Sequence, residues 1–262
     1  MTPRVLLRGG GDLASGVALR LHHAGFRVVI AELPRPLAVR RLVAFSEAVY
    51  EGQTIVEDAT ARLVTPGQID ATLARREIPV IIDPEAETIR ATRYAILIDA
   101  RLLKTPPQPL PVPLHIGLGP GFSAPRDCHA VIETRRGHTL GRVYWQGQSA
   151  PDSGQPEGDP RRVLRAIEDG ILVTRAQIGD HLEAGQLIAE IQSKTENRKS
   201  NIVSPFQGVL RGLLRGGMDV TRGLKLGDVD ARDDPALCRL VSDKALAVGG
   251  GALEAILSFT GR

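Results

Sequence analysis

Three consecutive glycines near the start of the chain, Gly9-Gly10-Gly11, separate two segments with different patterns. The apolar run before them, residues 5–7, predicts a buried parallel strand. After them, residues 12–24 carry apolar side chains at helical spacing, and Gly25 is typical of a helix end. A second apolar run, residues 28–31, predicts the next strand. The sequence therefore predicts a strand–glycine turn–helix–strand unit.

This unit has the arrangement of a dinucleotide-binding turn, because its glycines follow the pattern G-x-G-x-x-A. The first glycine permits a tight turn and Gly11 lets a phosphate approach the backbone. The helix N-terminus favours an anion, and Glu32, at the end of the second strand, is placed to bind a ribose. We therefore predict that the ligand is bound by Gly9, Gly11, Asp12, Ser15 and Glu32. The alternative is a glycine turn that serves only tight packing.

Two charged residues leave the nature of the ligand open. Asp12 is a good residue for the start of a helix, but its carboxylate would repel a bare pyrophosphate at close range. Either this side chain points away as a cap, or a cation bridges it to the ligand. Arg35, shortly after Glu32, would favour a 2′-phosphate, so the sequence does not separate NAD from NADP.

Alternating strand and helix patterns continue beyond this unit. Strands are predicted near residues 79–82, 95–98 and 113–116, with helices near 66–76 and 85–92. This alternation predicts an α/β fold with a Rossmann-like parallel sheet domain over residues 1–147. Asp83 and Asp99 then lie at the carboxyl ends of strands, where they fit a ligand site or a turn equally well.

A second glycine cluster follows a strand-like run. Gly117 and Gly119 predict a further backbone-lined binding loop, and charged residues come shortly afterwards. A carboxylate, a guanidinium and an imidazole at Glu133, Arg136 and His138 could bind an anion and move a proton. We predict these three as catalytic residues, since function is common on loops at strand ends. The alternative is a short charged run that is simply solvated.

An internal repeat lies in the second half, where residues 170–188 and 208–226 align without gaps at an offset of 38. The repeat predicts a small pseudo-symmetric β domain over residues 161–240, similar to the hammerhead fold of biotinyl and lipoyl domains. Lys194 and Lys199 lie between the repeats without the sequence context of a modified lysine, so no covalent biotin or lipoate is predicted. Residues 241–262 predict a C-terminal helical tail that packs back on the body.

Composition narrows the classes of partner. The net charge is only +3 and aromatic residues make up 3% of the chain, so no nucleic-acid partner is predicted. The chain has two cysteines and no CxxC pair, so no metal site is predicted. No apolar run approaches the roughly 20 residues of a membrane helix, and no secretory signal is visible. We therefore expect a cytoplasmic protein without a membrane partner.

Several motifs together resemble those of one family. RGGGDLASGVALRLHHAGF, GLGPGF, VIETRRGHTLGRV, GLKLGDVDAR and SDKALAVGGGALEAIL occur in this order along the chain. They resemble the YqeB-type accessory proteins of selenium-dependent molybdenum hydroxylase systems, which are distantly similar to the XdhC/CoxI maturation factors with their Rossmann domain. The resemblance implies a role in the maturation of a molybdenum hydroxylase and in handling the molybdenum cofactor.

Three functions remain open from the sequence. The first is an accessory protein that binds a nucleotide-containing ligand, either NAD(P) or a molybdopterin dinucleotide, and assists a molybdenum hydroxylase. The second is an NAD(P)-dependent oxidoreductase acting on a small substrate, with His138 as the general acid. The third is a non-catalytic scaffold whose glycine turn is only structural. Whether the protein is an enzyme is left open.

Overall fold

The computed structural model describes residues 3–92, 94–154, 158–194 and 198–260. The chain forms two compact units. Unit 1 comprises Met1–Pro36, Ala44–Ser153 and Val241–Arg262, and unit 2 comprises Leu37–Val43 and Gly154–Leu240. Unit 2 thus takes a short segment from within the first predicted domain, and the C-terminal tail belongs to unit 1. Between the two predicted domains, which end at residue 147 and begin at residue 161, residues 155–157 lie outside the described residues.

Unit 1 contains a nine-stranded sheet in the order β10-β9-β7-β6-β1-β2-β5-β4-β3. Seven strands from β9 to β4 in this order run parallel, whereas β3 and β10 pair antiparallel at the two edges. The nine strands are β1 (Arg4–Arg8), β2 (Arg27–Glu32), β3 (Gln53–Val56), β4 (Ala59–Leu63), β5 (Ile78–Ile82), β6 (Ile96–Asp99), β7 (Leu114–Leu118), β9 (Ala130–Ile132) and β10 (Val143–Tyr144). A separate pair joins β8 (Ser123–Ala124) to β11 (Gly147–Gln148).

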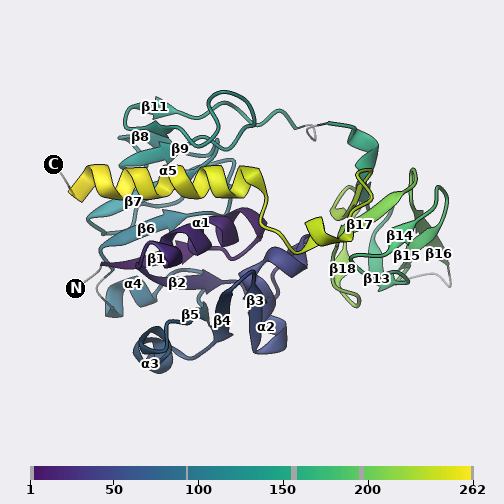
Figure 1. Cartoon of the computed structure of the whole chain (residues 1–262), viewed down its shortest axis with the longest axis horizontal. Helices are drawn as coiled ribbons and strands as arrows, with labels where there is room; N and C mark the ends of the chain where they lie inside the picture. The colour runs from purple at the N-terminus through teal and green to yellow at the C-terminus, as the bar shows by residue number, and fades with distance from the viewer. Residues whose placement is uncertain (1–2, 93, 155–157, 195–197, 261–262) are drawn as a thin grey trace. The chain divides into compact units, whose positions relative to one another are not determined.

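Helices of unit 1 cover the sheet. They are α1 (Asp12–His23), α2 (Ala48–Glu51), α3 (Ile69–Ala74), α4 (Thr88–Ala91) and α5 (Asp243–Thr260), with short 3-10 turns η2 (Phe45–Glu47) and η3 (Pro66–Gln68). Figure 1 shows α1 and α5 side by side on one face. An apolar cluster on the opposite face joins strand residues such as Leu6 and Leu97 to Ile69 of α3 and Ile89 of α4.

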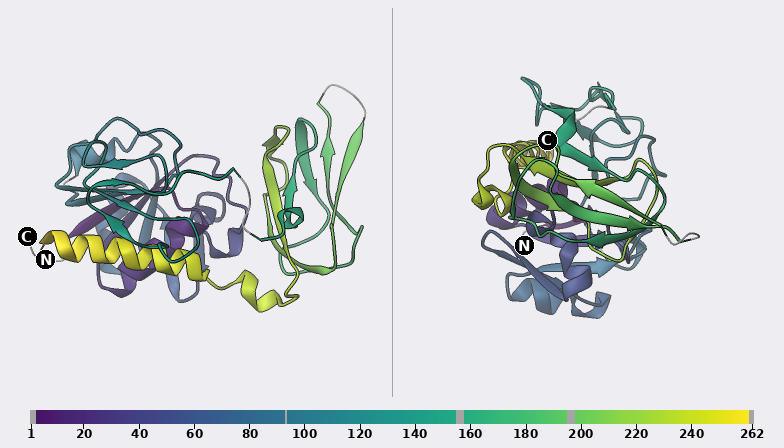
Figure 2. Two further views of the ribbon diagram at one scale, coloured as in Figure 1. Left: turned by 90° about the horizontal axis from the view of Figure 1, so that it is seen from above. Right: turned by 90° about the vertical axis from the view of Figure 1, so that its right-hand side faces the viewer.

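The helix from the chain's end packs closely against the first helix because glycine lines the contact. A Cβ placed on Gly16 of α1 would lie 2.5 Å from the Cβ of Ala245 in α5. Gly251, further along α5, makes a similarly close contact, because a Cβ placed on it would lie 2.1 Å from the carbonyl oxygen of Gly141. Figure 2 shows α5 running lengthwise along unit 1. The C-terminal segment is therefore part of the core of unit 1.

Unit 2 is built from two four-stranded antiparallel sheets, in the orders β12-β19-β17-β14 and β16-β15-β13-β18. The strands are β12 (Val163–Arg165), β13 (Gly170–Thr174), β14 (His181–Leu182), β15 (Leu187–Gln192), β16 (Lys199–Val203), β17 (Gly208–Leu213), β18 (Asp219–Val220) and β19 (Lys225–Asp230), with 3-10 turns η1 (Arg41–Val43), η4 (Pro160–Arg162) and η5 (Pro235–Cys238). At the repeat offset of 38 residues, β13 corresponds in sequence to β17, and β15 corresponds to β19. Short strands β14 and β18 each join the sheet of the other repeat.

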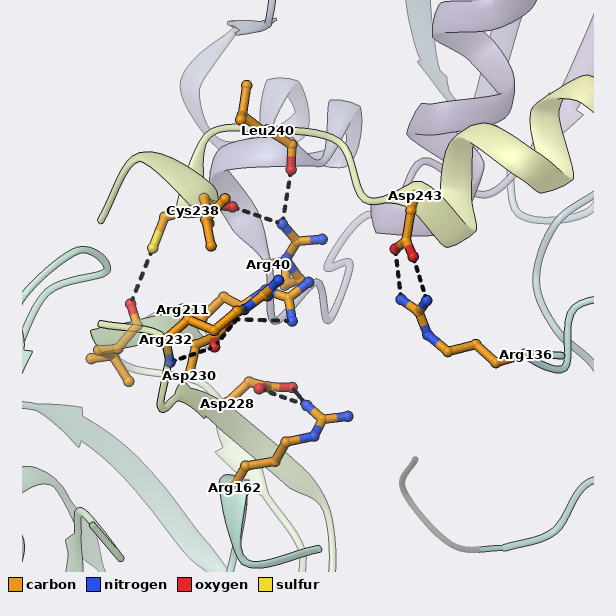
Figure 3. A network of polar contacts seen from close by, with 12 residues as sticks. Arg40, Arg136, Arg162, Arg211, Asp228, Asp230, Arg232, Cys238, Leu240 and Asp243 are labelled. Carbon is orange, nitrogen blue, oxygen red and sulfur yellow. Dashed lines mark hydrogen bonds and ion pairs between the residues drawn. The ribbon is translucent and has the colours of Figure 1, made fainter. Parts of the chain in front are cut away.

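A shared apolar core holds the two sheets of unit 2 together. It includes Leu172 and Ile191 of one sheet and Leu210 and Leu226 of the other, all fully buried. Val39, from the segment taken out of the first half of the chain, packs against this core. Asp228, buried in β19, is held by Arg162 at 2.5 and 2.7 Å (Figure 3).

The prediction of a Rossmann-like parallel sheet domain followed by a hammerhead (biotinyl/lipoyl-like) domain is wrong. The sheet of unit 1 is mixed, and the Pro-rich connection from β6 to β7 contains no helix among its residues 100–113, all of which are described. Unit 2 consists of two antiparallel sheets, each of which contains strands from both repeats, together with the segment Leu37–Val43. The local pattern predicts individual strands and helices, but edge pairing and strand exchange depend on contacts between distant residues.

The glycine contact between α1 and α5 can be tested with two identical substitutions. We expect Gly16→Ala to lower the free energy of unfolding by about 1–3 kcal/mol, because the added methyl group collides with Ala245. Gly250→Ala is the matched control, since Gly250 is exposed in α5 and no described atom outside the helix lies within 4 Å of its added Cβ. Higher helix propensity should raise its stability by about 0.5–1 kcal/mol. Urea unfolding measures both, and equal effects would contradict the packing argument.

Candidate functional site

The glycine turn connects the carboxyl end of β1 to α1. Gly9 has a φ of +94°, a conformation that residues with a side chain rarely adopt, and its N–H donates to the carbonyl of Ala31. Gly11 is the N-cap residue of α1, without a side-chain cap. Apart from its chain neighbours Gly10 and Asp12, no described residue has an atom within 4 Å of the position that a Cβ on Gly11 would take. The backbone at the start of α1 therefore has room for an approaching group.

Glu32 binds the glycine turn itself. Its carboxylate accepts hydrogen bonds from the Gly10 N–H at 2.6 Å and from the Leu33 N–H at 2.7 Å. The side chain is buried, and burial raises the pKa of this carboxyl, although the two backbone hydrogen bonds act in the opposite direction. Glu32 thus ties the end of β2 to the turn after β1.

Ser15 also serves the turn. Its hydroxyl donates to the Gly10 carbonyl at 3.1 Å and accepts from the Phe45 N–H at 2.8 Å. The Ser46 N–H donates to the same Gly10 carbonyl, and a Cβ on Gly10 would lie 2.9 Å from the Ser46 nitrogen. The close approach that Gly10 permits is therefore made by the protein's own backbone. Asp12 begins α1 directly beside this turn.

The order of strands in the sheet reverses at this point. From β1, the chain continues to β2 on one side, and β6 later takes the place on the other side. Ligands of open α/β sheets bind at such switch points, outside the carboxyl ends of the strands. Here the side chain of Arg101 lies over the turn, because a Cβ on Gly9 would be 3.7 Å from its Cγ. The guanidinium of Arg101 binds both oxygens of Asp99, at 2.9 and 2.6 Å.

The carboxyl edge of the sheet, where its parallel strands end, carries both charged and apolar residues. Arg8, the last residue of β1, is buried and donates to the Pro84 carbonyl at 2.6 Å. Asp83 caps α4, because its carboxylate accepts from the N–H groups of residues 87 and 88. Large apolar side chains are exposed at or shortly after the ends of β2, β5 and β6: Leu33 at 49%, Ile82 at 49% and Leu102 at 44%. Anchored charges beside exposed apolar side chains suit an anion with an apolar ring attached.

Sequence reasoning missed Arg8 and Arg101. A signal was present, because each is an arginine at or just after the carboxyl end of a parallel strand, where ligand sites form. Their proximity follows only from the adjacency of β1 and β6, which residues 9–95 separate along the chain.

The second glycine cluster serves packing in the structure. A Cβ on Gly117 would lie 2.3 Å from the ring of Phe122, and Gly119 has a φ of +82°. A Cβ on Gly119 would lie 3.0 Å from the Thr134 hydroxyl. Ligand binding by Gly117 and Gly119 stays a prediction, with an alternative use of both glycines now visible.

The three predicted catalytic residues have different surroundings. Glu133 is 1% exposed, and its two oxygens accept from the N–H groups of Arg135 and Ala150. Arg136 makes two hydrogen bonds, of 2.5 and 2.7 Å, to Asp243 at the start of α5 (Figure 3). His138 is exposed. Their catalytic role stays a prediction, but two of the three already bind groups of the protein.

The described residues form neither a metal-binding cluster nor a membrane-spanning helix. Within residues 3–92, 94–154, 158–194 and 198–260, no three or more His, Cys, Asp or Glu side chains are grouped so as to hold a metal ion. No described helix has the length and apolar character to cross a membrane. Of the predicted unmodified lysines, Lys194 pairs with Asp219 and Lys199 with Glu190. Between them, residues 195–197 lie outside the described residues.

Comparison with solved structures gives distant similarities. An aspartoacylase family protein of Mesorhizobium loti is 10% identical with a TM-score of 0.30, covering 87% of this chain and 85% of its own. The ectoine utilization protein EutE of Ruegeria pomeroyi is 11% identical with a TM-score of 0.31 over the same shares. A succinylglutamate desuccinylase of Silicibacter is 12% identical with a TM-score of 0.27, covering 87% and 84%.

The expectation of a Rossmann-like fold is overturned by the mixed sheet of unit 1, and these distant similarities add no argument to it. Their TM-scores are too low to assign an activity to this chain.

Sequence comparison gives a clearer relationship. No family model matches the chain. An alignment of 263 residues, which covers 97% of the chain, is 43% identical to YqeB of Escherichia coli (strain K12). The chain spans 47% of that relative's length, or about half. The resemblance to YqeB-type proteins that the sequence motifs indicate is confirmed.

Proposed function

We propose that unit 1 binds a nucleotide-containing ligand at the carboxyl edge of β1, β2 and β6, and that the protein is a cytoplasmic accessory protein of a molybdenum hydroxylase. The observation that carries the ligand proposal is the position of Arg101. Its side chain lies over Gly9 at the switch point of the sheet, beside the unobstructed backbone of Gly11. An arginine side chain against Gly9 and a helix N-terminus after Gly11 suit a phosphate.

The residues of the turn divide into two roles under this proposal. Gly9 and Gly11 give the ligand access to the backbone, and Arg101, whose charge Asp99 balances, supplies the guanidinium N–H groups that Asp99 does not use. Glu32 and Ser15 position the turn, since their polar atoms bind Gly10 and its neighbours. The carboxylate of Asp12, at the first position of α1, repels inorganic phosphate and weakens its binding unless a cation accompanies it.

The exposed apolar side chains after the strands support a ligand with a ring system. Leu33, Ile82 and Leu102 would each lose solvent contact against a planar group, at about 25 cal/mol per Å² of apolar surface. NAD(P) and a molybdopterin dinucleotide both combine ring systems with a pyrophosphate, so both fit the proposal.

Support for the partner comes from the sequence alone. The motifs of the chain resemble those of accessory proteins in molybdenum hydroxylase systems, and the chain spans about half of its relative YqeB. The cytoplasmic location agrees with two cysteines, Cys128 and Cys238, that are both buried and unpaired as thiols.

Ligand binding is tested by adding a methyl group at the turn. We expect Gly11→Ala to fold with stability within about 1 kcal/mol of the wild type, because its φ of −70° suits alanine and its Cβ meets no described atom. The methyl group should lower nucleotide affinity about tenfold or more by blocking the approach of a phosphate. Calorimetry with NAD(H), NADP(H), and cytidine and guanine nucleotides measures this.

Gly67→Ala is the control, since Gly67 also has an unobstructed Cβ position but lies in η3, away from the turn. Wild-type protein that binds none of these nucleotides would refute the ligand proposal.

The raised pKa of Glu32 predicts that the free energy of unfolding depends on pH. Its pKa is raised in the folded protein above the ordinary value near 4.5, so the folded state binds the proton more tightly than the unfolded chain. The wild type should therefore lose stability relative to Glu32→Gln as the pH rises from about 4.5 through the raised pKa. At neutral pH, the glutamine also leaves one backbone N–H without an acceptor, at about 1–3 kcal/mol. Urea unfolding of both proteins across this range checks the sign, and a pH-independent difference would contradict it.

The partner is tested in cells that produce a molybdenum hydroxylase. We expect hydroxylase activity to fall when the gene for this protein is deleted, and to be restored by wild type and by Gly67→Ala but not by Gly11→Ala. If all three proteins restore hydroxylase activity equally, the accessory role does not depend on the proposed ligand site. Unchanged activity after deletion would refute the accessory role.

A further inference from the structure

Arg8 is a buried cation without a carboxylate partner. The residue is 5% exposed, and its Nη2 donates to the Pro84 carbonyl at 2.6 Å. Among the described residues, its remaining guanidinium nitrogens have no hydrogen-bond or ion-pair partner. These nitrogens are not fully buried, so solvent still reaches them. A small molecule arriving at the carboxyl edge could therefore reach the same atoms.

The nearby carboxylates are committed elsewhere. Asp99 binds Arg101 through both oxygens. Asp83 accepts from two backbone N–H groups and from the Thr88 hydroxyl. Burial lowers the pKa of Arg8, and the positive charge of Arg101 lowers it further, although Asp99, Glu85 and Asp83 act in the opposite direction. The carboxylates nearby thus do not offset the cost of burying this charge.

A buried charge without a partner is costly, because the protein interior replaces the lost hydration poorly. Replacing such a group by an apolar side chain of similar volume is often neutral or stabilising. An arginine at this place therefore costs stability, and residues that break the rules of packing are expected at functional sites. Guanidinium groups bind phosphate and carboxylate in a forked geometry.

We propose that Arg8 binds a second anionic group of the ligand held at the glycine turn, so that the ligand contains a diphosphate. This inference rests on the proposed function of the same edge. Arg8 immediately precedes Gly9, and Arg101 both lies over Gly9 and acts electrostatically on Arg8. Both anion positions therefore lie at the carboxyl end of β1, one at the start of α1 and one at Arg8. Adjacent phosphates occur in dinucleotides and nucleoside diphosphates, and a nucleoside monophosphate would fill only one position.

The test compares Arg8→Met with wild type in the full chain. Calorimetry uses two pairs of probes: ADP against AMP, and inorganic pyrophosphate against inorganic phosphate. We expect wild type to prefer the diphosphate in each pair. Arg8→Met should lose about tenfold to a hundredfold in affinity for ADP and pyrophosphate, the loss expected from a charge-assisted hydrogen bond, and less than threefold for AMP.

Two further variants control for charge and folding. Arg4→Met removes an arginine from the same strand, and Arg4 lies at the opposite end of β1 with an ion pair to Asp70. This variant should bind ADP as the wild type does. Arg8→Lys keeps the charge without the fork, so its affinity for ADP should lie between those of wild type and Arg8→Met.

Stability without ligand gives a second readout. Arg8→Met should unfold at a temperature equal to or above that of the wild type, because it removes a buried charge without a partner. An unfolding temperature well below the wild type's would assign Arg8 to the structure of the edge and overturn the inference. Equal ADP affinity of Arg8→Met and wild type would also overturn it. If Gly11→Ala still weakens binding in that case, the proposed function stands without the diphosphate; if wild type binds none of the probes, both fail.

Discussion

The hydrogen bond from the Gly10 N–H to the Glu32 carboxylate fixes the carboxyl edge of unit 1. It joins the end of β2 to the turn after β1, and the Leu33 N–H on the same carboxylate fixes where the chain goes next. Since α1 begins directly after this turn, the same contact sets the start of the helix. Ser15 then ties the helix to the segment that begins at Phe45. A carboxylate predicted to face a ligand thus holds in place the backbone that is proposed to bind it.

Charge at this edge is distributed in an uneven way. Asp99 and Arg101 neutralise one another, and Glu32 and Asp83 are satisfied by backbone N–H groups. Arg8 is left with one carbonyl. Burial of these groups costs free energy that apolar side chains would not cost. Such a concentration of buried charge on one edge of a sheet, beside a glycine turn, is typical of a binding site rather than of a core built for stability.

Unit 2 shows how a repeat becomes a single structure. Neither repeat closes its own sheet, because β14 pairs with β17 and β18 pairs with β13. Each half therefore needs the other to complete its hydrogen bonding and to cover its apolar face. The segment Leu37–Val43 adds to this unit, with Arg41 donating to the Leu213 carbonyl and Arg40 to that of Leu240 (Figure 3). A domain boundary drawn along the sequence cannot include such a segment.

The sequence by itself determined the strand–glycine turn–helix–strand unit, the repeat and the resemblance to YqeB-type proteins, because each depends on residues close together or on motifs in order. Ribose binding by Glu32 stays a prediction, and the structure adds its hydrogen bonds to Gly10 and Leu33, because the spacing gives its distance along the chain and not the direction of its oxygens. Only the tertiary structure decided the mixed sheet, the strand exchange in unit 2 and the position of Arg101 over Gly9. These depend on which distant strands become neighbours, and burial and hydrogen bonding across the whole unit settle that choice.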